Sequence, residues 1–555
     1  MASKTMLDLV KEANCRLLFS ALDEIEGNKS LVWGDEDMIK LANLFVGGRQ
    51  LKTLVQEMLS LYKPKAPSTP NVVYFLHSTI EAVDKLIDHM QRINTSNACN
   101  YVFFVPDVWF VARERLMENT AIYSRIEWVR SLPLRWLPSP AGIASLNLPD
   151  LHSRVLLNGD WTYLHKCALA VDQLESWCRH PIPIFASGKW SEEVLNMFAK
   201  MRNNGPGRTS NPAGLGLNRI VMVDRWLDVL TPMLIQQTYA GLLAEQYGFR
   251  LNGSISVDQA EYEQKALPQP GKMDIHLFDE VFDKVKNAHR DCFAQEISPV
   301  LKELREFKEI DREKMSVAEI KKIVAMLDGH NQKKMLADRH MRLAEMLTPP
   351  FRDKLFDIIL IEQGEKTHSF IEELIIAAGP INDALRLISL QSTCSGGLKT
   401  AVMNAYDKMI FHSYGSSGMN QMLKLKKIGL IREKSSSRMQ CTDYPALQWT
   451  SAKRTRRVLV EDSDLPANEP QIPYRGYIPL LVRIIEEGFS VNFATWKSNG
   501  VSNRLPPHGT VILVLGGVTA GESAALQRNP DISLVAASDL TDGHRLINHL
   551  TNIVD

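Results

Sequence analysis

Residues 218–248 read NRIVMVDRWLDVLTPMLIQQTYAGLLAEQYG, and this stretch decides the fold. Ile220 to Val223 form an apolar, β-branched run of strand length, which is typical of a buried parallel strand. Asp224 and Arg225 end the run with charge, and a helical pattern follows. Gly248 is placed to cap that pattern at its C-terminal end. The stretch therefore predicts a strand that leaves a sheet, turns and enters a long helical region.

The N-terminal part alternates strands with helices. Strand patterns lie at 30–33, 72–76 and 101–105, and helical patterns lie at 6–25, 36–62 and 79–93. Such alternation indicates a parallel sheet with helices on its faces. We therefore expect a first α/β domain that spans residues 1–132.

A second α/β unit begins near Pro133, with strands expected at 154–157, 182–185 and 220–223. Two further strand patterns, 511–515 and 532–536, stand near the C-terminus without N-terminal partners of their own. The simplest arrangement adds these two strands to the sheet of the second α/β unit. This predicts a discontinuous second domain, 133–235 with 469–555, interrupted by a large helical insertion at 236–468.

Within the insertion we expect a helical hairpin at about 316–347. Ser316 to Glu319 fit a capping box, in which the hydroxyl and the glutamate satisfy opposite amides of the first turn. Asp328 and Gly329 are expected to end the first helix, and the second helix should run to Leu347. The fold class is thus α/β plus all-α, with two parallel-sheet domains and a helical third domain.

Composition is that of an ordinary globular protein. The chain has 555 residues, 45% hydrophobic and 23% charged, and its net charge is zero, so no global field favours nucleic acid. Seven scattered cysteines without a C-x-x-C pair indicate free thiols in a reducing cytosol. No signal peptide or membrane-spanning run is found. If the protein works at a membrane, other molecules should bring it there.

A basic stretch at 423–457 leaves two interpretations open. It is either a solvated loop or a surface for an acidic partner or anionic lipid.

No coherent catalytic or metal-binding set emerges, so we predict neither enzyme activity nor a cofactor. Gly47 to Thr53 lacks the glycine before the lysine that a phosphate loop needs. His544 and His549 are five residues apart, which does not put two ligands on one helical face. Gly516 to Gly521 follows a strand and precedes a helix, and close backbone packing is the favoured use of these glycines. A nucleotide-using α/β enzyme stays open as an alternative, since helix amides there could bind an anion.

The chain resembles the SM (Sec/Munc-like) family of SNARE-binding fusion proteins, most closely the vacuolar protein sorting class C branch. The pattern D-R-x-x-D-x-x-T-P followed by T-Y-x-G-L-x-x-E-x-x-G is matched at Asp224, Arg225, Asp228, Thr231, Pro232, Thr238, Tyr239, Gly241, Leu242, Glu245 and Gly248. Two C-terminal patterns match at Gly476, Tyr477, Pro479, Leu480, Arg483 and Glu486, and at Gly516, Gly517, Val518, Thr519 and Glu522. For Asp224 and Arg225, a buried pair at a domain junction is favoured over direct partner contact.

The resemblance implies an arch of three domains and the function of an SM subunit in the HOPS and CORVET tethers. It implies binding of Qa- and R-type SNARE motifs and of a class C solenoid subunit, with indirect attachment to late endosomal, lysosomal or vacuolar membranes. The sister branch, which acts at recycling endosomes, remains an alternative. SNARE helices should lie between domain one and the hairpin. An amphipathic helix needs apolar pockets there, and the contact candidates are Ile323, Met326, Leu327, Gln332, Lys333, Met335 and Leu336.

Overall fold

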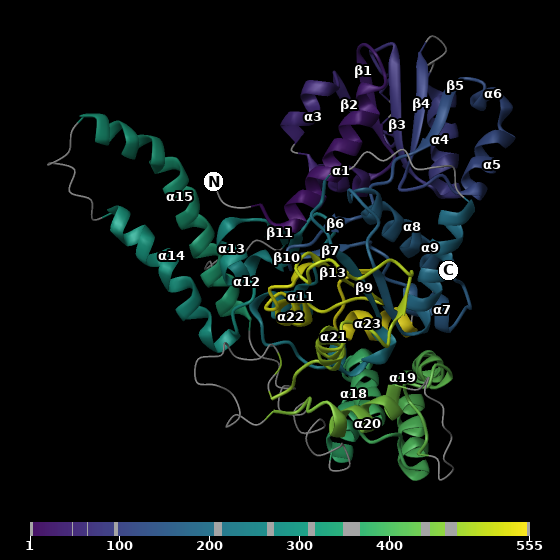
Figure 1. The fold of residues 1–555 in the computed structure, drawn as a ribbon, viewed down its shortest axis with the longest axis vertical. Coiled ribbons are helices and arrows are strands. Elements are labelled where there is room, and N and C mark those ends of the chain that lie inside the picture. Colours follow the sequence, from purple (N-terminus) through teal and green to yellow (C-terminus); the bar gives the residue numbers. More distant parts are fainter. Residues whose placement is uncertain are drawn as a thin grey trace.

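The computed structural model describes residues 4–46, 48–63, 65–93, 98–204, 214–263, 271–308, 317–347, 367–434, 445–460, 474 and 476–551. The described chain forms two separate parallel-sheet units and a helical region (Figure 1). The N-terminal unit and a long helical arm both rise from the central sheet unit, which gives the molecule an arch shape.

The N-terminal sheet has the strand order β2-β1-β3-β4-β5, and all of its pairs are parallel. Its strands are β1 (Lys29–Trp33), β2 (Glu57–Ser60), β3 (Asn71–His77), β4 (Cys99–Val105) and β5 (Ile126–Ser131). Helices α1 (Met6–Asp23) and α2 (Glu36–Phe45) pack on one face, and α4 (Ile80–Arg92) and α5 (Phe110–Glu118) pack on the other. The short helices α3 (Gly48–Leu54) and α6 (Thr120–Tyr123) complete this unit.

The prediction of one helix over 36–62 is wrong at its end, because Glu57–Ser60 is the edge strand β2. The segment pairs with β1 in parallel, and only Leu59 of its four side chains is buried. Pairing with a neighbouring strand, which local periodicity does not report, therefore outweighs the helical pattern. Strand β5 carries mostly exposed or half-buried side chains, so it gave no apolar run to detect.

The second sheet has the order β12-β8-β9-β13-β14-β7-β6. Its strands are β6 (Leu137–Pro138), β7 (Ile143–Ser145), β8 (Ile184–Ser187), β9 (Arg219–Asp224), β12 (Lys497–Ser498), β13 (Thr510–Leu515) and β14 (Ile532–Ala537). Strands β9 and β13 are buried at every residue and pair in parallel, with Val511 opposite Ile220 and Val514 opposite Val223. This confirms that the C-terminal strands join the sheet begun before the helical insertion. The exact domain limits stay a prediction.

The strand expected at 154–157 is wrong. Those residues belong to helix α7 (Leu151–Leu156) and its end, and the strand beside β14 is β7. A four-residue apolar run fits a strand or a helical turn equally well. Here the Arg154 amide donates to the Asp150 carbonyl, which commits the run to a helix. Helices α8 (Thr162–Ser176) and α9 (Lys189–Asn204) pack against one face of the second sheet.

The insertion is not entirely helical, because β10 (Ser254–Asp258) and β11 (Lys272–His276) form an antiparallel pair. Ile255, Val257 and Ile275 are buried at every second position of the pair, a period-two pattern that the helical prediction missed. Helices α11 (Tyr239–Tyr247), α12 (Gln259–Glu263) and α13 (Glu280–Val285) lie around this pair, while α10 (Leu230–Met233) packs against α18 (Ile381–Cys394) and α23 (Gly543–Thr551).

The C-terminal half of the insertion is helical in its described residues. It contains α17 (His368–Ile376), α18 (Ile381–Cys394), α19 (Thr400–Lys427) and α20 (Pro445–Thr455). Helices α21 (Leu480–Ser490), α22 (Ala520–Leu526) and α23 (Gly543–Thr551) follow and return the chain to the second sheet.

The arm consists of α14 (Phe293–Lys308) and α15 (Val317–Met346). Helix α15 continues through Asp328 and Gly329, so the predicted break at these residues is wrong. One glycine in a helix interior costs about 1 kcal/mol, which a 30-residue helix packed at its base can absorb. The hairpin therefore pairs α14 with α15, while Ser316 of the proposed capping box lies outside the described residues.

The base of the arm is continuous with the core of the second sheet. Ala337 and Leu343 of α15 are fully buried in the same cluster as Val221 of β9 and Ile512 of β13. The arm is therefore held at its base by the central unit. Among the described residues, no helix is long and apolar enough to cross a membrane.

Because β9 and β13 share one ladder, we expect them to open together although the whole insertion separates them in sequence. Native-state hydrogen exchange should give the amides of 220–223 and 511–514 the same opening free energy and the same dependence on denaturant. Faster exchange of 511–514, with 220–223 still protected, would contradict a single cooperative sheet.

Candidate partner-binding surface

Asp224 caps helix α9. Its carboxylate accepts hydrogen bonds from the Trp190 amide at 2.7 Å, from the Ser191 amide at 2.7 Å and from the Ser191 hydroxyl. Burial raises the pKa of Asp224 to about 6, although these hydrogen bonds oppose the shift. A Cβ on Gly188 would lie 2.3 Å from the carboxylate, so only glycine fits there. An anion site at this helix N-terminus is therefore filled by the chain's own side chain.

Arg225 is the centre of a buried ionic cluster. Its Nη1 donates to both carboxylate oxygens of Glu522, at 2.8 and 2.6 Å, and its Nη2 lies 3.2 Å from the Asp228 carboxylate. All three side chains are fully buried. Burial lowers the pKa of Arg225, but the Glu522 and Asp228 carboxylates outweigh it and raise that pKa above its ordinary value. Asp224 and Arg225 are thus buried at a junction as expected, but each has its own partners.

Asp228 connects this cluster to the C-terminal part of the chain. Its carboxylate accepts from the Thr231 amide at 3.1 Å, from the Thr231 hydroxyl at 2.5 Å and from the Leu481 amide at 3.0 Å. The Thr231 hydroxyl also lies 2.8 Å from the Tyr477 hydroxyl, which in turn accepts from the Leu480 amide. Pro479 is the N-cap of α21. These residues join α10 to α21.

The second half of the family pattern positions α11. Thr238 caps the helix through the Gly241 amide, and a Cβ on Gly241 would lie 2.6 Å from that of Gln236. Glu245 forms an ion pair with Arg386, whose Nε donates to the Met233 carbonyl at 2.8 Å. Gly248 caps the helix end, as predicted, with a φ of 68°. Pro232 is buried within α10.

The glycine turn after β13 is a packing device, as the sequence favoured. Gly516 has a φ of 100°, and a Cβ there would lie 2.6 Å from His152 and 2.7 Å from Arg225. A Cβ on Gly517 would lie 3.0 Å from Thr541. The first turn of α22 is closed by a capping box between Thr519 and Glu522. The amides that a phosphate would need are therefore buried and bonded internally, which removes the support for a nucleotide site here.

Gly476, which belongs to the other C-terminal family pattern, turns the chain with a φ of 63°.

The arm is anchored by a buried hydrogen-bonded triad. His340 of α15 lies between the Asp279 carboxylate, 3.0 Å from Nε2, and the Tyr239 hydroxyl, 3.0 Å from Nδ1. Burial raises the pKa of Asp279, but its hydrogen bond and charge interaction with His340 outweigh this and hold that pKa below its ordinary value. Asp279 also caps α13. The Asp279 carboxylate can only accept, so Nε2 of His340 donates to it.

The predicted contact residues fall on different surfaces of α15. Met335 is 67% exposed, and Gln332 is exposed beside it on the same side of the helix. Lys333 instead forms an ion pair at 2.5 Å with Glu303 of α14, and Leu336 packs against the core at the arm's base. Leu327 is half-buried. The side chains of Ile323 and Met326 lie outside the described residues.

The open face of α15 is a polar stripe with one apolar member. Its exposed residues are Asp328, Asn331, Gln332, Lys334, Met335, Asp338, Arg342 and Glu345. Sequence periodicity did not identify this stripe, because it is set by the side on which α14 and the core pack. A flexible methionine surrounded by acidic and basic side chains suits a transient contact with an amphipathic helix.

The described part of the basic stretch is folded rather than free. Lys426 forms an ion pair with Asp407, Lys424 donates to the Thr551 carbonyl at 2.7 Å, and Arg456 pairs with Glu487. The solvated-loop interpretation is therefore wrong for Lys424 and Lys426, which lie in α19, and the charges of all three residues are partly paired within the fold.

A polar cleft of about 920 Å³ lies at the carboxyl ends of β1, β3 and β4 in the N-terminal unit. Its opposite charges pair with one another, Lys40 with Asp37 at 2.9 Å and Lys85 with Glu81 at 2.6 Å. Because these charges are paired, the cleft suits contact with the polar rim of a partner protein better than binding of a strongly charged ligand. Among the described residues, no three histidine, cysteine or acidic side chains are grouped to hold a metal ion.

The whole fold is similar to solved SM protein structures. It matches "SM Protein Vps45 in Complex with Qa SNARE Tlg2" with a TM-score of 0.64 at 14% identity, over 98% of this chain and 97% of that one. The Unc18 chain in "Crystal structure of the Unc18-syntaxin 1 complex from Monosiga brevicollis" matches with a TM-score of 0.63 at 13% identity, over 98% and 99%. At such low identity these matches establish the fold.

The chain belongs to the Sec1 family, whose model matches residues 29–548. It is 38% identical to "Vacuolar protein sorting-associated protein 33A" of Caenorhabditis elegans, over 98% of this chain and 96% of the relative. The protein of the same name from Rattus norvegicus is 24% identical over 94% and 92%. "Vacuolar protein sorting-associated protein 33B" of Homo sapiens is 24% identical, but over only 60% and 54%. These relatives identify the vacuolar protein sorting 33 branch of the family.

Replacing Arg225 with methionine should strongly destabilise the central unit. The change leaves two buried carboxylates without their cation, and breaking a buried pair costs about 3–5 kcal/mol. Thermal and urea unfolding measure the effect. Arg130→Met is the matched control, because Arg130 pairs with Glu24 at an exposed site and should lower stability only slightly. Equal stability of the two variants would contradict the central role of Arg225.

Replacing His340 with leucine should loosen the arm. The change leaves the Asp279 carboxylate and Tyr239 hydroxyl without their shared partner, at a cost of about 1–3 kcal/mol per group. Hydrogen exchange of the base of α15 is the measurement, with Asp338→Ala on the exposed side as control. Unchanged protection of residues 337–343 in the leucine variant would show that the triad does not anchor the arm.

Proposed function

We propose that this protein is a SNARE-binding SM subunit of an endolysosomal tethering complex. It templates or protects SNARE assembly before fusion with late endosomes, lysosomes or the vacuole. Membership in the Sec1 family over nearly the full chain carries this proposal. Two solved relatives are named as complexes with a Qa SNARE and with syntaxin 1, which supports SNAREs as the partner class.

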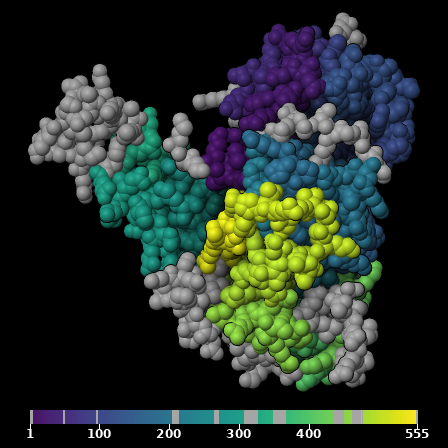
Figure 2. All heavy atoms as spheres, viewed as in Figure 1, coloured from purple at the N-terminus to yellow at the C-terminus, as the bar shows by residue number. Residues whose placement is uncertain are grey.

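The binding surface we assign is the open face of the arm. Figure 2 shows the arm standing apart from the N-terminal unit, with a hollow between them. The exposed stripe around Met335 and Gln332 offers one apolar anchor in a polar surround, and the anchored base holds it in place. A helix bound there gains an apolar contact at its centre and polar contacts at its rim. We also propose Ile323, Met326, Leu327 and Lys333 as contact candidates, and we assign Leu336 to the core at the arm's base.

We assign the class C solenoid subunit to a different surface, on α17 and α19. These helices pack against each other and leave large apolar side chains in solvent: Ile376 is 72% exposed and Phe411 is 54% exposed. Exposed apolar side chains of this size favour a protein partner. Membrane attachment then comes through the complex, at the cytoplasmic face of late endosomes, lysosomes or the vacuole.

The match to the 33A-type relative supports a HOPS or CORVET role over the recycling-endosome role of the sister branch, because the 33B-type relative covers less of the chain. We also propose that the protein has no enzyme activity and needs no cofactor. The internal bonding of the Gly516 turn supports this choice. Titration with ATP and GTP is the direct test, and stoichiometric binding of either would contradict it.

Replacing Met335 with aspartate should weaken SNARE-motif capture by about 2 kcal/mol or more, because a charge replaces a central apolar anchor. Pull-down with purified Qa- and R-SNARE motifs measures it, and the melting temperature should stay unchanged. Met117→Asp is the matched control, since this methionine is 39% exposed on α5, away from the arm.

Two further variants separate this surface from the core and from the second partner. Leu336→Asp should lower the melting temperature, because Leu336 packs at the arm's base. Phe411→Asp should keep SNARE capture and lose co-purification of the solenoid subunit. Full SNARE capture by a well-folded Met335→Asp variant rules out the assigned surface.

A further inference from the structure

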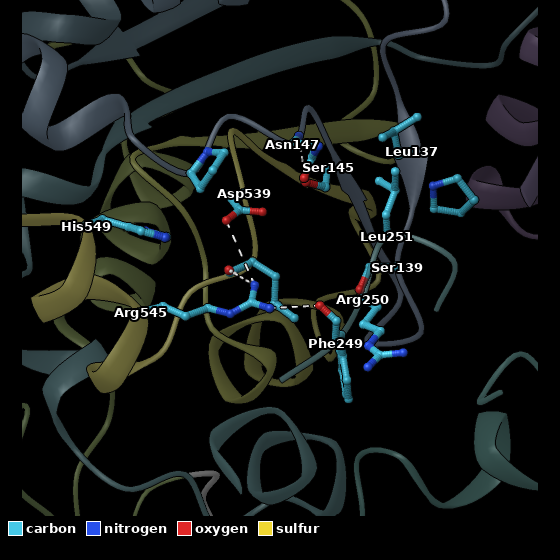
Figure 3. A pocket seen from close by; sticks show the side chains of 13 residues that line it. Leu137, Ser139, Ser145, Asn147, Phe249, Arg250, Leu251, Asp539, Arg545 and His549 are labelled. Atoms are coloured by element: carbon cyan, nitrogen blue, oxygen red, sulfur yellow. Dashed lines mark hydrogen bonds and ion pairs between the residues drawn. The ribbon is translucent and has the colours of Figure 1, made fainter. Parts of the chain in front are cut away.

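A pocket of about 270 Å³ lies at the carboxyl ends of β7 and β14 in the second sheet (Figure 3). Three segments that are distant in sequence line it, within residues 137–149, 249–251 and 539–549. The pocket therefore lies where the start of the central unit, the start of the insertion and the C-terminal segment meet. It is separate from the arm.

The position of the pocket in the sheet is one where α/β proteins bind ligands. Helix α22 connects β13 to β14 and packs on one face of the sheet, whereas α7 and α8, which follow β7 in that order, contribute to the core on the opposite face. In open α/β sheets, ligands bind outside the carboxyl ends of strands at the point where the connections change face. The corresponding sites at α9 and α22 are filled by Asp224 and Glu522, but this pocket is not filled by a side chain of the described residues.

Asp539 supplies to the pocket a carboxylate that accepts a hydrogen bond from the Leu540 amide but has no close cation. Its side chain is only 14% exposed, and the nearest cation, Nη1 of Arg545, is 4.0 Å away. That guanidinium is already committed, because it donates to the Leu540 carbonyl at 3.0 Å and to the Phe249 carbonyl at 2.8 Å. Figure 3 shows Asp539 and Arg545 side by side at the pocket. A largely buried carboxylate with so weak a counter-ion favours a donor from outside the chain.

Three further polar side chains line the pocket without a hydrogen bond to any described residue: Ser139, Asn147 and His549. Burial lowers the pKa of His549, so its imidazole is neutral and can accept a hydrogen bond. Leu137, Leu251 and Phe249 give the pocket an apolar wall, and Arg250 and Arg545 line it as well. The pocket thus combines a carboxylate and neutral acceptors with an apolar wall.

We propose that this pocket binds a cationic group on a short apolar chain, an alkylammonium or alkylguanidinium. Such a group can come from a lysine or arginine side chain of a partner protein or from a free small amine. The charges support a cation, because Asp150 and Asp542 add their negative potential to that of Asp539. The arginines at the pocket are paired elsewhere, Arg545 as described and Arg250 with Asp274. A bound cation would connect the three segments that meet here.

Ligand-observed saturation-transfer NMR on the full chain tests the proposal with n-butylguanidine, n-butylamine and n-butanol. We expect saturation of both cations and none of the neutral alcohol. Asp539→Asn should weaken binding at least tenfold, and Asp88→Asn on α4 should leave it unchanged. Asn147→Gly is the second variant, because the φ of 52° at Asn147 suits glycine, and it should weaken binding several-fold.

Binding should also depend on pH. Burial raises the pKa of Asp539 to about 6, although Arg545 opposes the shift, so the carboxylate is ionised at neutral pH and protonated below that value. The charged or titratable groups that face it are Arg545, Asp542, His549, Asp150 and Arg250. Cation affinity should therefore fall as the pH is lowered through about 6, and Asp539→Asn should abolish this dependence.

The source of the cation is distinguished by comparing n-butylguanidine with a capped Gly-Arg-Gly peptide. Tighter binding of the peptide indicates a partner's side chain, and tighter or equal binding of the free probe indicates a small amine. Equal saturation by n-butanol, or wild-type affinity in a folded Asp539→Asn variant, overturns the proposal. These outcomes are independent of SNARE capture, because no arm residue is changed.

Discussion

The structure depends first on one buried cation. Arg225 ends the central strand β9 without any solvent exposure, so its charge must be met by carboxylates of the protein. Glu522 meets it from α22, almost 300 residues later, and Asp228 meets it from the next turn of the chain. Asp228 also holds the start of α21 through the Leu481 amide. The two halves of the second sheet are therefore joined by charge as well as by the β9–β13 ladder.

The position of the arm follows from that cluster through a short series of contacts. Helix α22, which carries Glu522, donates its Gly521 amide to Gln236 at 2.8 Å, just before α11. Helix α11 begins with Thr238 and Tyr239, and the Tyr239 hydroxyl reaches His340 of α15. The family pattern around residue 230 thus acts as a support for the projecting helices. The side chains of this pattern make contacts within the fold, while the exposed residues of α15 lie elsewhere.

The central sheet also shows how an α/β scaffold can lose its ligand sites. Asp224 occupies the helix N-terminus where an anion would bind, and Glu522 and Thr519 close the first turn of α22. These internal carboxylates use the same amides that would otherwise cradle phosphate. At the β7–β14 edge, by contrast, polar side chains line a pocket. The central sheet therefore fills two candidate anion sites from within and leaves a pocket at its edge.

The sequence by itself determined the two parallel sheets and the return of the C-terminal strands. Continuous β-branched runs such as 220–223 and 511–515 are stable only when both faces are buried, and unpaired buried strands require a shared sheet. It did not determine where the arm turns, because Gly329 costs a helix little and a 30-residue helix can absorb it. It also could not separate exposed Met335 from packed Leu336. Periodicity reports which side chains favour burial, but only the tertiary structure decides which neighbour covers them and which face stays open.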